Sequence, residues 1–259
     1  MTSLKKNFIY NVVYQMLLII LPLITAPYIA RTLGAEGVGI YSYTYSVAQY
    51  FLLFAMLGIS NHGNRSIAAV REDDCKLSRT FWSIYSIQAF MYVLAIIAYL
   101  IYLFAFNVDN KTIVAIQFIY VVSGALDISW YFFGTEQFKI TVTRNMIIKI
   151  ATVILMFIFV HNPGDLAKYT VIMAGGTFLS QAYLWTYIFR QVDVVKVNWI
   201  DIKKHIKEVI ILFIPVIAYS IYKLMDKIML GNMTTYMQVG YYENAGKIIN
   251  IPMGIITAL

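Results

Sequence analysis

Apolar residues run along this chain in long blocks that short polar segments separate. Most blocks hold about the 20 residues that a helix needs to cross the hydrocarbon core of a bilayer. Transmembrane strands would instead show segments of about ten residues with alternating hydrophobicity. The pattern therefore predicts an all-α polytopic membrane protein with about eight transmembrane helices. The expected spans are 8–30, 38–60, 80–106, 112–134, 141–160, 169–189, 209–230 and 239–259.

The composition of the chain agrees with a membrane protein. Of its 259 residues, 60% are hydrophobic and 13% are charged, whereas about 25% of the residues in soluble domains are charged. The mean hydropathy is +0.70. A net charge of +7 could indicate a nucleic-acid-binding protein. In a chain this apolar it favours basic loops beside anionic lipid, so no nucleic-acid partner is expected. The single cysteine, Cys75, excludes a disulfide framework and a cysteine-based metal cluster.

The basic residues are distributed unevenly between the two sides of the predicted membrane. With a cytoplasmic N-terminus, 13 of the 20 Lys and Arg residues lie in cytoplasmic segments and three in the opposite loops. This asymmetry predicts a multi-pass protein of the cell (cytoplasmic) membrane in that orientation. No A-x-A-like cleavage site follows the N-terminus, so the first block is expected to be a helix and not a removed signal peptide. The cytoplasmic residues are Lys5, Lys6, Arg65, Arg71, Lys76, Arg79, Lys139, Arg144, Arg190, Lys196, Lys203, Lys204 and Lys207, and the outer ones are Arg31, Lys111 and Lys168.

Two parts of the chain resemble each other. A proline-bearing span ends at Leu-Gly (33–34), and the next begins at Val-Gly (38–39) with aromatic residues. The same order returns at 230–231 and 239–240, after a connection four residues longer. Chance could produce this match, but an internal repeat is typical of transporters and is the preferred interpretation. It predicts an N-terminal lobe of six spans at 1–190, a basic cytoplasmic linker at 191–208, and the apparently truncated start of a second lobe at 209–259.

The sequence contains no recognisable catalytic motif. Gly34, Gly37 and Gly39 form G-x-x-G-x-G, but a dinucleotide-binding loop has a different order and follows a strand. These glycines are expected to make a tight turn between two helices. H-E-x-x-H, G-x-S-x-G and Walker motifs do not occur, and the three histidines are scattered over predicted loops. The chain is therefore predicted not to be an enzyme and to hold no metal or cofactor; a proton-relay role for His62 is a minor alternative.

Several predicted spans carry a stripe of polar and aromatic residues. Spacings of three and four place the members of each stripe on one helix face. Hydrogen bonds between helices would explain any single Tyr or Gln. Stripes on four helices together favour a shared hydrated cavity. The second span contributes Tyr41, Tyr45 and Gln49, and the fourth contributes Gln117, Tyr120, Gly124, Asp127 and Tyr131.

Ionisable residues also fall inside the predicted spans, where each unpaired charge costs about 2.5–3.5 kcal/mol. Lys223, Asp226 and Lys227 lie at i, i+3 and i+4, so Asp226 can neutralise only one lysine and one positive charge should face the bundle interior. Glu243 and Lys247 are expected to satisfy each other as an i,i+4 pair. The predicted cavity is thus polar, aromatic and cationic, which suits a ligand with an anionic head group and a sugar or apolar part.

Three segments carry a resemblance to a known family. They are PLITAPYIARTLGAEGVGIYSY, QYFLLFAMLGISNHGNRSIAAVRED and DISWYFFGTEQFK. The chain resembles the Wzx-type oligosaccharide flippases over essentially its whole length. These flippases are the polysaccharide-biosynthesis branch of the MOP superfamily, which also holds MATE exporters and MurJ-type lipid II flippases. In that pattern the second segment is the exit of the second span into a basic loop.

The resemblance implies two pseudo-symmetric helix bundles around a cavity that opens alternately to each side. The implied substrate is an oligosaccharide on a polyprenyl diphosphate, flipped to the outer leaflet for capsule, exopolysaccharide or O-antigen assembly. A polysaccharide polymerase and glycosyltransferases are the implied protein partners. The motifs add Arg31, in ARTLG, and Asp127 and Trp130, in DISW, to the expected substrate-binding residues. The full expected set is Arg31, Asp127, Trp130, Lys223, Asp226, Lys227, Tyr41, Tyr45 and Gln49.

The chain departs from the family pattern in its length, because family members have a complete second lobe. Two other interpretations therefore stay open. One is a truncated remnant or scaffold of the polysaccharide assembly machinery that does not transport. The other is an ion-coupled MATE-like exporter, which would prefer acidic cavity residues. Arg31 stands at the predicted outer end of the first span, where its side chain either reaches lipid head groups or faces the cavity, and both placements fit the sequence equally.

Overall fold

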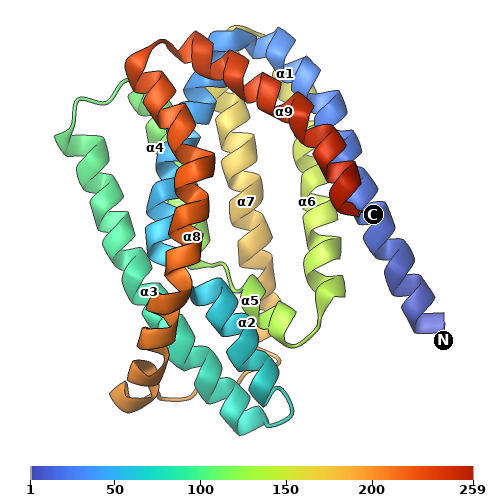
Figure 1. The fold of residues 1–259 in the computed structure, drawn as a ribbon, viewed down its shortest axis with the longest axis vertical. Coiled ribbons are helices and arrows are strands. Elements are labelled where there is room, and N and C mark those ends of the chain that lie inside the picture. Colours follow the sequence, from blue (N-terminus) through green and yellow to red (C-terminus); the bar gives the residue numbers. More distant parts are fainter. Residues whose placement is uncertain (1, 259) are drawn as a thin grey trace.

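Helices form every secondary-structure element of residues 2–258, which the computed structural model describes (Figure 1). Side chains are described for residues 21–221 and 224–249. The elements are α1 (Thr2–Met56), α2 (Ile59–Val70), α3 (Asp74–Ala105), α4 (Lys111–Ala125), α5 (Ser129–Gly134), α6 (Phe138–Phe159), the 3₁₀ helix η1 (Pro163–Asp165), α7 (Leu166–Ile188), α8 (Trp199–Met233) and α9 (Tyr236–Ala258).

Several of these helices are long and apolar enough to cross a membrane. Among the described residues they are Asp74–Ala105, Lys111–Gly134 and Phe138–Phe159. A fourth span forms if Trp199–Ile221 and Leu224–Met233, which are bent by 44° relative to each other, are counted as one. The protein is thus an all-α polytopic membrane protein, as the hydrophobic pattern predicts.

The first two predicted spans form one folded element, α1, with a kink at Gly34. Gly34 has φ 70° and ψ 173°, a conformation that a residue with a Cβ atom rarely adopts. The expectation that all three glycines make the turn is wrong, because Gly34 is the described glycine with positive φ. Gly37 and Gly39 lie within the helix that follows the kink. Their role must therefore be sought in helix packing.

The segment after the second span is a helix, α2, and not the loop that the sequence suggested. Its buried residues Ile59, His62, Gly63 and Ile67 recur at three- and four-residue spacing, so they share one face. This face packs against α5 and α3. The short polar segment thus becomes helical because tertiary packing covers its one apolar stripe.

Two further boundaries differ from the sequence-based expectation. The fourth span is interrupted after Ala125, and the chain resumes helical geometry at Ser129. α8 begins at Trp199, so the second half of the predicted linker at 191–208 is already helical. This segment, which carries Lys203, Lys204 and Lys207, thus extends the seventh span toward the predicted cytoplasmic side.

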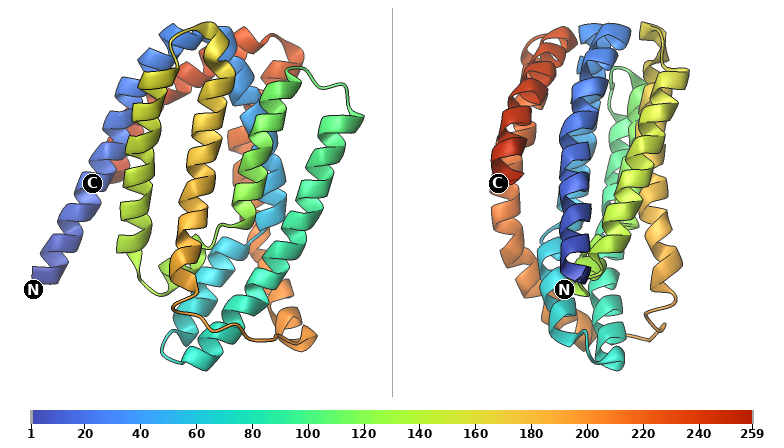
Figure 2. Two further views of the ribbon diagram at one scale, coloured as in Figure 1. Left: turned by 180° about the vertical axis from the view of Figure 1, so that it is seen from behind. Right: turned by 90° about the vertical axis from the view of Figure 1, so that its right-hand side faces the viewer.

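α1 lies between two groups of helices. In the side view α8 and α9 lie on one side of α1, and α6 and α7 lie on the other (Figure 2). α9 runs beside the half of α1 that precedes the kink (Figure 1), and its first residues contact α1 at Ala35 and Gly39, just after the kink. The second half of α1 packs against α3 and α4 through Ala48, Tyr92 and Val121, which are all buried. α1 therefore contacts nearly every helix that could line a central site.

The crossing of α1 and α9 is made by two glycines in a reciprocal arrangement. A Cβ atom added to Gly39 would overlap the carbonyl oxygen of Tyr236, and one added to Gly240 would overlap that of Ala35. Gly39 thus faces a residue four positions before Gly240, and Gly240 faces a residue four positions before Gly39. Val38 and Val239 precede the two glycines and are both buried. The two Val-Gly motifs that echo each other in the sequence are therefore in direct contact.

Replacing Gly39 by alanine should destabilise the protein, because the added methyl group must push α9 away from α1. Overpacking of this kind costs about 1–3 kcal/mol. Thermal unfolding of the purified chain in detergent would measure the loss. Gly246→Ala is the matched control, since a Cβ at this helical glycine of α9 meets no atom within 4 Å. Equal stability of the two variants would contradict the tight crossing.

Candidate functional site

Tyrosines from three helices meet below the kink of α1. The hydroxyls of Tyr41 and Tyr120 lie 2.9 Å apart and share a hydrogen bond. The Tyr41 ring stacks on Tyr45 at a centroid distance of 5.7 Å and meets the edge of Tyr169 at 4.8 Å. Tyr45 and Tyr120 make a further edge contact at 4.9 Å. We call Tyr41, Tyr45, Tyr120 and Tyr169 the tyrosine cluster; it joins α1, α4 and α7.

The polar stripes of the second and fourth spans thus contact each other directly. Gln117 is fully buried, and its Nε2 donates to Thr44 Oγ1 at 3.2 Å and to the Tyr41 carbonyl oxygen at 3.4 Å. The Gln117 Oε1 atom is buried without a hydrogen-bond partner in the structure. A buried amide oxygen left unpaired is costly, so it marks a place where a water molecule or a ligand hydroxyl would be favourable.

Charged side chains of α8 and α9 form a second cluster. Glu243 accepts an ion pair from Lys227 at 2.5 Å and one from Lys247 at 3.5 Å. The three side chains, which we call the α8–α9 charge cluster, are 17–31% exposed. Two lysines and one glutamate leave one net positive charge. The sequence suggested that Glu243 and Lys247 satisfy each other alone, whereas the structure shows that Glu243 also holds Lys227.

The charge cluster and the tyrosine cluster are neighbours. Glu243 is close enough to interact electrostatically with the hydroxyls of both Tyr45 and Tyr169. Amphipathic rings that carry hydroxyl groups therefore lie beside a net cationic centre. Such a combination can bind a phosphate through the ammonium groups and a sugar through ring faces and hydroxyls.

Asp226 contacts a residue of α9 that the sequence did not suggest. Its carboxylate accepts a hydrogen bond of 2.7 Å from the Tyr242 hydroxyl of α9, while Lys227 turns to Glu243. Of the two lysines expected to pair with Asp226, Lys227 is therefore bound to Glu243 instead. The side chain of Lys223 lies outside the described residues, so its pairing with Asp226 stays a prediction.

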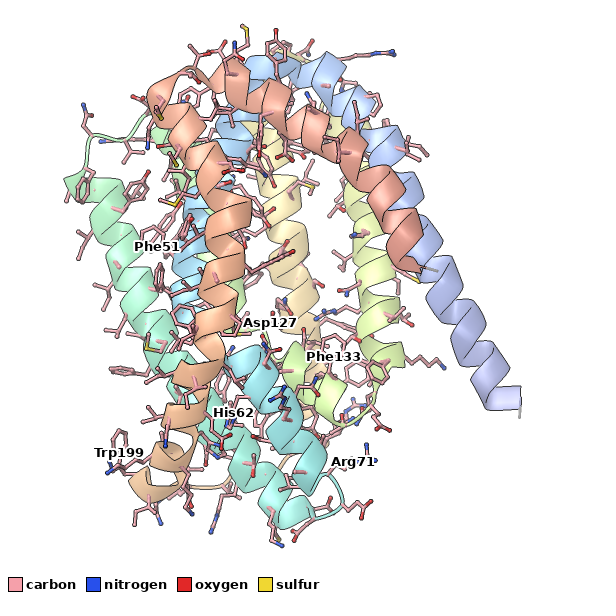
Figure 3. The ribbon with its side chains drawn as sticks, in the orientation of Figure 1. Phe51, His62, Arg71, Asp127, Phe133 and Trp199 are labelled. Atoms are coloured by element: carbon pink, nitrogen blue, oxygen red, sulfur yellow. The ribbon has the colours of Figure 1, made fainter. Side chains whose placement is uncertain are left out.

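Asp127 lies in the break between α4 and α5 (Figure 3), and Trp130 is the second residue of α5. The Asp127 carboxylate accepts a hydrogen bond of 2.9 Å from the backbone N–H of Ser129, which stabilises the start of α5. Trp130 is 1% exposed and donates from Nε1 to Gln88 Oε1 at 3.0 Å. Its ring packs against Gly63 so closely that a Cβ there would clash. In this conformation both residues stabilise the broken helix.

Arg31 and Gln49, the remaining predicted residues, both lie on α1. The Arg31 side chain is exposed, one turn before the kink at Gly34. Gln49 is half-buried on the face of α1 that carries Tyr41 and Tyr45. The structure thus gathers Tyr41, Tyr45 and Lys227 and leaves Arg31 at the surface.

An arginine that the sequence placed in a cytoplasmic segment is buried inside the bundle. Arg144 of α6 is 5% exposed and donates to the Ser180 carbonyl oxygen at 3.1 Å and to Gln181 Oε1 at 3.0 Å, both on α7. It also donates to Asn145 Oδ1 at 2.9 Å. The count of basic residues had no means of finding it, because the acceptors on α7 are neutral groups far away in the sequence.

His62 connects α2 to the first turns of α8. Its Nδ1 lies 2.9 Å from Glu208 Oε2, and its Nε2 lies 2.8 Å from Nδ1 of His205. Figure 3 shows His62 at the end of the bundle where α2 and α8 meet. Burial lowers the pKa of His62, although the Glu208 carboxylate opposes this shift. A neutral His62 fits the geometry by donating Nδ1–H to Glu208 and accepting from His205 at Nε2. Sequence spacing could not reveal this contact.

An apolar groove lies between α1 and α3. It has a volume of about 440 Å³ and is lined by Tyr50, Phe51, Phe54, Ala55, Met91, Leu94, Ala95 and Ala98. The Tyr50 hydroxyl is buried without a hydrogen-bond partner in the structure and interacts electrostatically with Asp226. Phe54 also contacts Phe213 of α8, with ring centroids 5.7 Å apart. The groove therefore lies beside α8, with Phe54 at Phe213 and Tyr50 within electrostatic range of Asp226.

Among the described residues, no group of three or more His, Cys, Asp or Glu side chains could hold a metal ion. The tyrosine cluster and the charge cluster supply ammonium groups, a carboxylate and tyrosine hydroxyls. These groups are suited to binding an anion with a polar body.

Comparison with known proteins gives two matches. The family model described as "Polysaccharide biosynthesis protein" matches residues 4–259. The "Putative O-antigen transporter" of Escherichia coli (strain K12) is 27% identical over 271 residues. That alignment covers 99% of this chain and 63% of the transporter, so the chain spans less than two thirds of the length of this relative. No solved structure is significantly similar to the chain.

Acidification should weaken the contact between α2 and α8. The pKa of His62 is lowered in the folded protein, so the unfolded chain, with a histidine pKa of about 6.5, binds the proton first as the pH falls. The stability that neutral His62 contributes is therefore present above about pH 6.5 and is lost below it. Thermal unfolding at about pH 8 and about pH 5.5 should show a larger loss for the wild type than for His62→Gln. An equal loss would contradict the role of His62.

Proposed function

The chain belongs to the polysaccharide biosynthesis protein family, and from this we propose that it moves a lipid-linked oligosaccharide across the cell membrane. The proposed substrate is an oligosaccharide repeat unit on a polyprenyl diphosphate, carried from the cytoplasmic to the outer leaflet by alternating access. The N-terminus is proposed to be cytoplasmic, and a polysaccharide polymerase and glycosyltransferases are the proposed partners. The protein acts as a transporter and not as an enzyme.

The α8–α9 charge cluster is the observation that carries this proposal. A positive charge inside a membrane protein is costly, so its presence favours a functional role. Lys227 and Lys247 supply two ammonium donors beside one carboxylate, which suits a diphosphate. The tyrosine cluster next to them offers ring faces and hydroxyls for the first sugar residues. Substrate binding is proposed to involve Tyr41, Tyr45, Gln49, Lys223, Asp226 and Lys227, with Arg31, Asp127 and Trp130 expected from the family resemblance.

The groove between α1 and α3 suits the polyprenyl chain of such a substrate. Its lining is apolar apart from the Tyr50 hydroxyl, and it approaches α8 through the contact of Phe54 with Phe213. A tail in this groove would keep the lipid in hydrocarbon while the diphosphate reaches the lysines. The apolar tail and the charged head of the ligand would thus bind to separate surfaces, one apolar and one charged.

The net positive charge argues against export of organic cations by a MATE-like mechanism, because such a ligand would be repelled by the lysine pair. A non-transporting role within the assembly machinery stays as the alternative. It is distinguished by expressing the 259-residue chain in a strain that lacks its matched flippase. Restored surface polysaccharide supports transport by this chain. Absence of polysaccharide, with the protein present in the membrane, favours the scaffold.

Removing the two ammonium groups should weaken diphosphate binding. We expect the purified chain in detergent to bind farnesyl diphosphate, and the double variant Lys227→Gln, Lys247→Gln to bind it at least about tenfold more weakly per lysine. Isothermal titration calorimetry would measure the difference. Lys204→Gln is the matched control, because Lys204 is an exposed lysine of α8 outside the charge cluster. Equal weakening by the control would show a general charge effect and contradict the site.

Filling the groove should affect the tail alone. Ala98→Trp is expected to lower the affinity for farnesyl diphosphate by about tenfold, because it occupies the space that the isoprenoid would take. The affinity for inorganic diphosphate should be unchanged. Ala115→Trp, at an exposed alanine of α4 that does not line the groove, serves as the control. Loss of inorganic diphosphate binding in Ala98→Trp would contradict the separate binding of head and tail.

A further inference from the structure

Large apolar side chains are exposed where α8 begins. Trp199 and Ile200 are 67% and 70% exposed, and Val194 in the preceding segment is 77% exposed. Figure 3 shows Trp199 on the outer side of the first turn of α8, directed away from the bundle. Apolar side chains gathered at a surface in this way are typical of a site that another molecule covers.

The bilayer does not reach this end of α8. α6 (Phe138–Phe159) is about 33 Å long at 1.5 Å per residue, close to the hydrocarbon thickness of about 30 Å. The first turns of α8 extend beyond the start of α6, beside α2 and α3 (Figures 1 and 2). On α8 itself the run of exposed isoleucines begins at Ile210, so Trp199 lies roughly 16 Å further out, beyond a head-group layer of about 5–8 Å. Lipid therefore does not cover Trp199.

Lysines surround these apolar side chains. Lys196, Lys203 and Lys207 are exposed, and none of them forms an ion pair with another described residue. The acidic residues of the segment 194–208 have partners of their own: Asp201 pairs with Lys204, and Glu208 with His62. Four lysines and two acidic residues leave this segment with a net charge of +2. The surface is thus apolar in part and basic at its rim.

α2 and α3 hold this segment at both of its ends. On the side before it, Trp82 Nε1 donates to the Asp193 carbonyl oxygen at 2.9 Å, and the Asp193 N–H donates to Ser78 Oγ at 3.1 Å. On the other side, His62 Nδ1 lies 2.9 Å from Glu208 Oε2. A surface that is fixed in advance loses less conformational entropy when a partner binds, so its contacts yield more affinity.

We propose that the start of α8 is a docking surface for a protein of the cytoplasm whose contact segment combines apolar residues with Asp and Glu. Trp199 is its anchor, because tryptophans are among the residues that most often dominate the binding energy of an interface. The lysines select an acidic partner and accelerate its association. This surface, which we call the α8 platform, consists of Val194, Lys196, Trp199, Ile200, Lys203 and Lys207.

The α8 platform is independent of the tyrosine cluster and of the α8–α9 charge cluster. It requires the proposed cytoplasmic orientation of this end of the bundle but no transport by the chain. Anionic lipid would suit the lysines, but it would leave Trp199 and Ile200 uncovered beyond the head groups. A protein partner buries both the apolar and the basic part of the surface.

The position of Trp199 relative to lipid is tested first. The 259-residue chain is placed in vesicles of phosphatidylcholine and phosphatidylglycerol, with and without brominated acyl chains. The fluorescence difference between the wild type and Trp199→Phe reports on Trp199, because the other tryptophans are common to both proteins. We expect acrylamide on both sides of the membrane to quench this difference and brominated lipid to leave it unchanged. Quenching by brominated lipid overturns the docking surface and indicates a membrane anchor.

Docking itself is tested by photocross-linking in the native cells. The chain carries p-benzoylphenylalanine in place of the exposed Ile200, and mass spectrometry identifies the cross-linked segment. We expect an adduct with a protein segment rich in Asp and Glu. Its yield should fall by about tenfold in Trp199→Ser and in Lys203→Glu. Lys139→Glu should leave the yield unchanged; this control makes the same change of charge at an exposed lysine of α6.

Several results of the cross-linking would contradict the proposal. Adducts with lipid alone, adducts with a segment that lacks acidic residues, or no adduct at all overturn the docking surface. An adduct that survives Lys203→Glu at full yield does so as well. The outcome is separate from that of the proposed function. An acidic protein adduct without restored surface polysaccharide supports the docking surface alone, whereas restored polysaccharide without an adduct supports transport alone.

Discussion

The glycine crossing between α1 and α9 is the constraint on which the rest of the site depends. Gly39 and Gly240 let the two backbones approach until each meets a carbonyl oxygen of the other. That approach brings the start of α9 beside the tyrosine-bearing face of α1 and sets Glu243 within range of Tyr45. It also positions α9 for its ion pair with Lys227 of α8. Small residues serve this purpose in membrane proteins, where helix association relies on close packing and polar contacts.

Much of the architecture could be predicted from the sequence, because only helices and closed barrels satisfy their backbone hydrogen bonds inside a bilayer. Long apolar blocks predict helices, and Gly34 predicts a turn where the structure has φ of 70°. The helix α2 was missed, since its apolar stripe is short and is stabilised by neighbours distant in sequence. The break before α5 was also missed, and the Asp127 carboxylate, expected in the polar stripe, accepts a hydrogen bond from the first residue of that helix. A local hydrophobic pattern thus predicts that a segment is helical, whereas an interruption of a helix depends on contacts with residues far away in the sequence.

The candidate site shows the same limit at the level of single side chains. Helical spacing placed Tyr41 and Tyr45 on one face, and the structure brings this face to Tyr120 and Tyr169. Spacing also offered Asp226 and Lys247 as partners for the nearest charges on their own helices. The pairing of Lys227 with Glu243 joins two helices instead, and no one-dimensional pattern states which faces of α8 and α9 meet. The sequence thus predicts which residues share a helix face, but it does not predict which residues of another helix they contact.

The reciprocity of the glycine crossing has a consequence for the history of the fold. Gly39 faces Tyr236, four residues before Gly240, and Gly240 faces Ala35, four residues before Gly39. The same offset of four residues on both sides is typical of an isologous interface, in which one surface patch serves both partners of a two-fold dimer. A shorter ancestor with a single Val-Gly hairpin could have made the same contact with a second copy of itself. Fusion of two such copies would then have converted an interface between molecules into an internal helix crossing.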